Sequence, residues 1–134
     1  MATIGIETVL AWHAALNQAD VERLLSSSID DVEVGGPRGA GHGADLLREW
    51  LARAGVHLEP RRVFCRDQVV IVEQAARWPT ADGQRADPQE VASVFRVEDG
   101  RVASVLRHLD LASALHAAGL DFSDEHVPAR PFPG

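Results

Sequence analysis

The sequence predicts one α+β domain, on three observations. Its 134 residues suit a single domain that buries about two-thirds of its unfolded surface. Helix-like segments gather in the first 54 residues, whereas four strand-like segments follow one another between residues 56 and 109. Strands joined by short turns pair antiparallel, because a parallel crossover needs a dozen or more residues. Helices at the N-terminal end can then cover one face of a curved, mostly antiparallel sheet.

The first 55 residues are predicted to form three helices around one strand. Apolar side chains recur at helical spacing in the first and third helix. Asp20 is expected to be the N-cap of the second helix, and Gly55 to end the third. The predicted helices cover residues 4–18, 21–28 and 43–54, and the predicted strand covers Ile29–Val34.

The following residues change to the alternation of strands. Pro60 predicts an edge or a bulge, and Asp99-Gly100 predicts a tight hairpin. The domain is expected to span residues 1–120, and residues 121–134, which are rich in proline, to form an extended C-terminal tail. The predicted strands are 56–64, 69–78, 90–97 and 102–109, and a short helix covers 111–120.

A glycine-rich stretch, GGPRGAGHGA, occupies residues 35–44 between a strand and a helix. Residues 39–44 match the G-x-G-x-x-A spacing of a dinucleotide fingerprint. That fingerprint works inside a parallel βαβ unit, however, and this chain opens with helices and continues with hairpin-linked strands. We therefore expect a hinge, whose glycines take positive φ and let the chain turn sharply.

Composition narrows the range of partners. Acidic residues outnumber basic ones by 20 to 13, and the net charge of −7 argues against a nucleic-acid partner, since that binding rests on basic surface. No apolar run approaches the ~20 residues that span a bilayer, and the N-terminus lacks the features of a secretion signal. The single Cys65 suits a reducing compartment. We expect a cytoplasmic protein with no nucleic-acid or membrane partner.

The order of these segments resembles the SnoaL-like branch of the NTF2-like superfamily. The similar stretches are AWHAALNQADVERLLSSSIDDVEVGGPRG, GADLLREWLARAG, VVIVEQAARW and DGRVASVLRHLDLASALHAAGL. The resemblance implies a cone-shaped fold, with a pocket between the curved sheet and the helices, in a homodimer paired through the sheet. Members include ketosteroid isomerase, limonene epoxide hydrolase, polyketide cyclases, scytalone dehydratase and binding modules, so the fold alone does not decide the function.

The catalytic groups of these relatives are mostly replaced in this chain. The isomerase needs a tyrosine in its oxyanion hole, and the chain contains none. In the alignment with the epoxide hydrolase, Gln74 and Ala76 stand at the positions of its arginine and aspartate. Asp110 resembles the last-strand acid of the cyclases, with His108 two residues before it or His13 as a proton partner. Asp110 also precedes a helix, where an aspartate is a favoured N-cap, so both roles stay open.

The remaining candidates would line the pocket that the resemblance implies. Trp12 would form a wall, Arg38 and His42 would lie near its mouth, and Gln74 would face it from the central strand. No group of His, Cys and acidic residues has metal-ligand spacing, and we expect no metal or cofactor. The residues Arg61, Arg62 and Arg66 are expected to form a solvated sheet edge.

Three functions follow from these expectations. The first is a binding domain for a small, mostly apolar molecule. The second is an isomerase, cyclase or hydrolase of a polyketide-, steroid- or terpenoid-like substrate, with Asp110 as acid or base. The third is a protein–protein interaction module whose pocket is filled by its own side chains.

Overall fold

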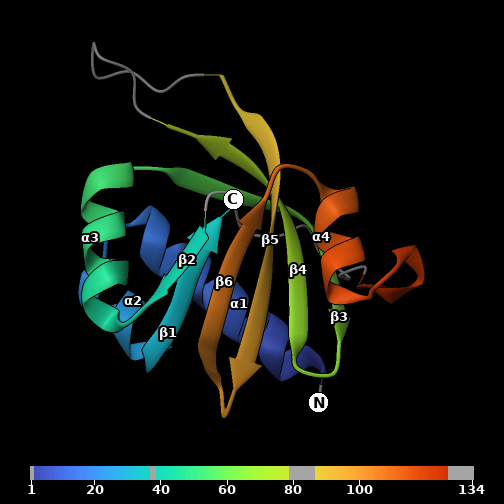
Figure 1. The fold of residues 1–134 in the computed structure, drawn as a ribbon, viewed down its shortest axis with the longest axis horizontal. Coiled ribbons are helices and arrows are strands. Elements are labelled where there is room, and N and C mark those ends of the chain that lie inside the picture. The colour runs from blue at the N-terminus through green and yellow to red at the C-terminus, as the bar shows by residue number, and fades with distance from the viewer. Residues whose placement is uncertain (1, 37–38, 79–86, 127–134) are drawn as a thin grey trace.

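The structure is a computed structural model that describes residues 2–36, 39–78 and 87–126 (Figure 1). All predicted helices and strands are present to within a few residues, and two short strands, β2 and β7, are additional. The elements are α1 (Ala2–Asn17), α2 (Val21–Ser26), β1 (Ser28–Gly36), β2 (Gly39–His42), α3 (Ala44–Ala54), β3 (His57–Arg66), β4 (Val69–Arg77), β5 (Gln89–Glu98), β6 (Arg101–His108), α4 (Leu111–Ala118), a 3-10 helix (Phe122–Asp124) and β7 (Glu125–His126).

The strands form one curved, unclosed sheet in the order β2-β1-β6-β5-β4-β3-β7. Strands β3 to β6 make the predicted antiparallel meander, and β1 joins it parallel to β6. The register of β3 shifts between Pro60 and Arg62, which confirms the bulge predicted at the proline. Asp99 and Gly100 both have positive φ and form the predicted tight turn between β5 and β6.

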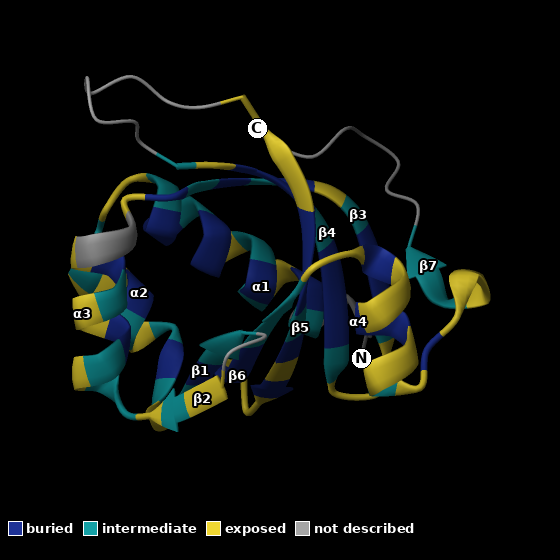
Figure 2. Ribbon diagram, turned by 45° about the horizontal axis from the view of Figure 1, so that its top comes forward, coloured by how far each residue is buried: buried dark blue, intermediate teal, exposed yellow. Residues whose placement is uncertain are grey.

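The two faces of the sheet carry separate apolar clusters, and Figure 2 shows how the buried residues are distributed over the strands and helices. Alternate residues of a strand point to opposite faces, so each strand supplies both clusters. The inner face packs against α1 and includes Val72 and Phe95. The outer face includes Phe64 and Ile71, and α4 covers part of it through Leu115. The N-terminal helices therefore lie on one face, as predicted, and the last helix lies on the other.

The glycine-rich segment is a hairpin as well as a hinge. Gly39 and Gly43 have φ of 131° and 112°, so the prediction of positive φ is confirmed there. The segment also contributes β2, which pairs antiparallel with β1 and which the sequence analysis did not predict. At Gly35 a side chain would not fit, because a Cβ atom would lie 2.5 Å from that of Ala40 on the paired strand. Glycine is rare in strands, so the glycine-rich sequence of β2 does not predict a strand.

Two arginines of β3, Arg62 and Arg66, hold the segment that follows α4, so the edge predicted to be solvated is partly covered. Arg61 is exposed, as predicted, and pairs with Glu59. Strand β7 pairs with β3 and covers its edge. Arg62 donates two hydrogen bonds to the Glu125 carboxylate, at 2.8 and 2.9 Å, and Arg66 donates to Asp124. Bidentate pairs of this kind fix geometry as well as charge. The segment predicted as an extended tail therefore begins with a 3-10 helix and a strand that joins the sheet.

Within the described residues, no helix is long and apolar enough to cross a membrane.

Candidate functional site

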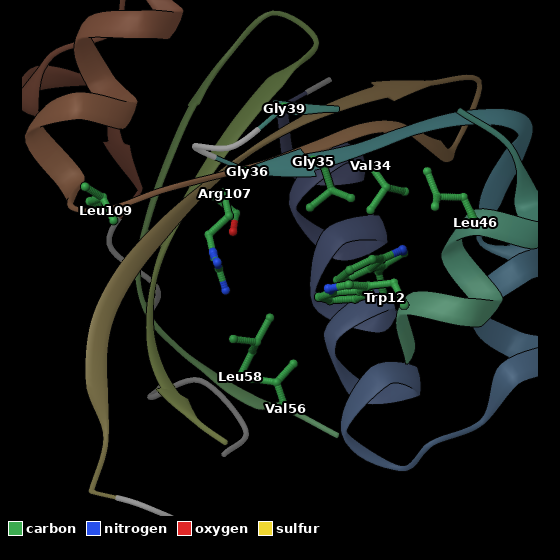
Figure 3. A pocket seen from close by; sticks show the side chains of 13 residues that line it. Trp12, Val34, Gly35, Gly36, Gly39, Leu46, Val56, Leu58, Arg107 and Leu109 are labelled. Carbon is green, nitrogen blue, oxygen red and sulfur yellow. The ribbon is translucent and has the colours of Figure 1, made fainter. Parts of the chain in front are cut away.

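A cavity of about 610 Å³ lies between the inner face of the sheet, α1 and α3 (Figure 3). This volume falls within the range of about 300–1,000 Å³ that is usual for small-molecule sites. Three glycines of the β1–β2 hairpin, Gly35, Gly36 and Gly39, also line the cavity. Aliphatic side chains form most of the lining: Val34, Leu46, Val56, Leu58, Val105 and Leu109.

Two stacked tryptophans form one wall of the cavity. The ring centroids of Trp12 and Trp50 are 6.4 Å apart, with an interplanar angle of 23°. Trp12 is fully buried by its neighbours, meets Phe95 edge-on, and donates its indole N–H to the Ser28 hydroxyl at 3.2 Å. Ser28 in turn donates to the Leu24 carbonyl at 2.9 Å. Packing and hydrogen bonds therefore fix the position of Trp12. Trp12 lines the cavity, as the sequence analysis expected.

Beside the cavity, three buried polar side chains form a hydrogen-bonded chain. His13 Nδ1 lies 2.8 Å from the Val9 carbonyl oxygen, which can only accept, so Nδ1 carries the proton. Nε2 of the neutral imidazole then accepts from the Gln74 amide at 2.8 Å, and Gln74 Oε1 accepts from the Ser93 hydroxyl at 2.9 Å. Every member is satisfied, and Ser93 is the one that reaches the cavity.

The buried imidazole is kept neutral by its surroundings. His13 is 1% exposed, and burial lowers its pKa to about 4, although the hydrogen bond to Val9 acts in the opposite direction. A neutral side chain that does not line the cavity is not placed to exchange protons with a ligand. His13 and Gln74, which the sequence analysis named as a catalytic and a ligand-binding candidate, thus lie in the packed layer between α1, β4 and β5.

Arg107 is the charged side chain among the described residues that line the cavity, and the sequence analysis did not select it. Figure 3 shows its guanidinium extending into the cavity. The guanidinium carbon lies 5.3 Å from the centre of the Trp78 ring, a cation–π contact that holds the side chain from one side. The signal that could have found it is strand alternation, because Val105 and Arg107 share one face of β6.

The same alternation places His108 on the other face. His108 pairs with Ala92 of the outer cluster and lines a second, smaller cavity of about 360 Å³ beside the β1–β2 hairpin. Asp110 is exposed and caps α4, because its Oδ1 accepts the Ser113 N–H at 2.8 Å. This hydrogen bond lowers the pKa of the Asp110 carboxyl. The structure does not bring Asp110, His108 and His13 together in one site.

The other two predicted ligand-binding residues either do not line the main cavity or lie outside the residues that the structure describes. His42 is exposed on β2, with Nδ1 3.8 Å from an oxygen of the Asp31 carboxylate. It lines neither cavity. Arg38 lies outside the described residues. Within residues 2–36, 39–78 and 87–126, no three His, Cys, Asp or Glu side chains gather as a metal-ligand group.

Solved structures share this architecture. An LEH-like epoxide hydrolase from M. tuberculosis superposes with a TM-score of 0.71, at 24% identity over 88% of this chain and 96% of that one. TerC, co-crystallised with polyporic acid, gives 0.70 at 24% identity over 85% and 96%. A putative polyketide cyclase from Xanthomonas campestris gives 0.68 at 20% identity over 84% and 94%. These similarities establish the fold.

The sequence itself identifies the family. No protein of curated function matches the chain. The family profile of the SnoaL-like domain matches residues 9–105, which include α2, α3, strands β1 to β5 and most of α1 and β6. The cavity wall of Trp12 and Trp50 and the polar residue Ser93 all fall inside that span. The chain therefore belongs to the SnoaL-like domain family, within the NTF2-like fold that its sequence order predicted.

Proposed function

We propose that the chain is a small-molecule-binding protein whose cavity takes a mostly apolar compound containing a ring system. The observation that carries the proposal is the lining of the 610 Å³ cavity, where aliphatic side chains face a wall of two stacked tryptophans. Apolar walls with a few placed polar groups are typical of small-molecule sites. An aromatic wall in which the half-buried Trp50 is backed by the fully buried Trp12 adds favourable contact with a ring.

We favour a binding role over a catalytic one because of the chemical groups on the side chains that line the cavity. An isomerase, cyclase or hydrolase needs an acid or base within hydrogen-bond reach of the reacting group. None of the described lining residues carries a carboxylate or an imidazole. Asp110, the strongest catalytic candidate in the sequence, has its carboxylate engaged in capping α4. The interaction-module alternative predicts a filled pocket, which an open cavity of this volume argues against.

Titration with N-phenyl-1-naphthylamine, a neutral probe that fluoresces in apolar sites, tests the proposal. We expect saturable binding to the wild type and at least about tenfold weaker binding to Gly36→Leu. Gly36 lines the cavity, and the nearest described atom to a Cβ there would be in Arg107, at 3.8 Å, so a leucine should narrow the cavity without displacing the backbone. Melting curves should show that the variant is folded.

Asp110→Asn is the matched control for this titration. It removes the carboxylate but keeps a side chain that caps helices well, so stability and probe binding should both match the wild type. The proposal is wrong if the wild type does not bind the neutral probe, or if Gly36→Leu binds it as tightly as the wild type does.

A further inference from the structure

Arg107 is held among apolar groups without a carboxylate partner. It is half-buried, it lies between Val105 of β6 and Leu109, an exposed residue just after the strand, along the cavity lining, and its guanidinium stacks on the Trp78 ring. Among the described residues, no acidic side chain lies within ion-pair distance of its guanidinium, whereas Arg48, Arg61, Arg62 and Arg66 each have such a partner. A guanidinium partly removed from water gains most from a fixed anion, because the cost of desolvation is then offset.

Ser93 is the other polar side chain among the described residues that line the cavity, and it cannot hold an anion. It lies directly opposite Arg107 in the β5–β6 register, so both face the cavity. Its single hydrogen is donated to Gln74 Oε1, and the Gln74 amide is fixed in that orientation because its nitrogen donates to the neutral His13. Ser93 therefore presents lone pairs, which repel an oxyanion. The polar end of a ligand is directed to Arg107.

The overall negative charge of the chain bears on whether Arg107 could bind an anion. With a net charge of −7, the protein does not attract anions in general. An anion preference of the cavity would therefore come from a local group. The guanidinium presents parallel N–H groups that match a carboxylate in two-point geometry.

We propose that the ligand of the cavity is an organic acid, with an apolar ring body against the Trp12–Trp50 wall and a carboxylate or similar oxyanion bound by Arg107. This inference rests on the proposed function and names the class of ligand. Arg107 is then the residue that selects acids over neutral compounds of the same shape.

Calorimetric titration with 2-naphthoic acid and 2-naphthamide tests the assignment, because the two compounds differ in charge but hardly in shape. We expect the wild type to prefer the acid by at least about tenfold, the usual scale of a charge-assisted pair. Arg107→Met should remove the preference, and Arg107→Lys should retain part of it. Ser93→Ala should keep the preference.

Arg101→Met is the matched control, since it removes the same charge from an exposed position on the same strand. It should keep the preference for the acid. The assignment is overturned if the wild type binds both compounds within about twofold, or if Arg101→Met loses the preference as fully as Arg107→Met. Binding of neutral N-phenyl-1-naphthylamine separates the two failures: if that probe binds while the acid preference is absent, only the ligand class is wrong, and if it does not bind, the proposed function fails too.

Discussion

Gln74→Leu is expected to lower the free energy of unfolding by about 3 kcal/mol. Leucine has a similar size, so the loss comes from polar groups rather than from volume. The substitution leaves His13 Nε2 without its donor and the Ser93 hydroxyl without its acceptor, in a layer where all three side chains are at most 2% exposed. Each buried polar group left unsatisfied costs about 1–3 kcal/mol. Urea unfolding monitored by tryptophan fluorescence measures the change.

Gln89→Leu is the control for this substitution, because Gln89 is an exposed glutamine on β5. Its effect should stay within about 0.5 kcal/mol, as for most surface positions. In the double variant His13→Leu/Gln74→Leu, the cost should be smaller than the sum of the two single costs, since residues of one hydrogen-bonded network are coupled. Equal losses of unfolding free energy for Gln74→Leu and Gln89→Leu would show that the hydrogen bonds between His13, Gln74 and Ser93 do not contribute to stability.

Mild acid is expected to destabilise the protein through His13. The folded-state pKa of His13 is lowered from 6.5 to about 4, so the unfolded chain binds the proton more readily. The stability that His13 contributes is therefore fully present above pH 6.5 and is lost as the pH falls toward 4. A shift of this size corresponds to about 3 kcal/mol in all, of which about half is lost between pH 6.5 and 5.

The pH dependence of unfolding in His13→Gln isolates this contribution. The variant is less stable than the wild type at pH 7, but its stability should change little between pH 6.5 and 5, where few carboxylates titrate. His116→Gln is the control, because His116 is exposed on α4 and its removal should leave the acid sensitivity intact. A wild type and a His13→Gln variant with the same slope in this window would show that the folded protein accommodates the charged imidazole.

The sequence predicted the fold well because local signals agree with one another. Asp20 caps α2, Gly55 ends α3 in the left-handed conformation, and Asp99-Gly100 closes the β5–β6 hairpin. Strand β2 was missed because its sequence, GAGH, has no side-chain alternation to detect. Strand β7 has only two residues and depends on partners about 60 positions earlier in the chain, which no local pattern reveals.

The site was harder to predict for a physical reason. Whether a strand residue faces the cavity depends on the register of the whole sheet, and a shift by one residue exchanges the two faces. His108 and Arg107 are neighbours in the sequence, and the register assigns Arg107 to the inner face and His108 to the outer face. The chain of His13, Gln74 and Ser93 joins three elements, so its hydrogen bonds become visible only in the folded structure.

A crystal structure of the protein with 2-naphthoic acid is the most direct test of ligand binding in this cavity. The predicted result places the naphthalene rings in the cavity against the wall of Trp12 and Trp50, with the carboxylate within hydrogen-bond distance of the Arg107 guanidinium. A cavity that remains empty, with naphthoate absent or bound only on the outer face, would contradict both the proposed function and the assigned ligand class.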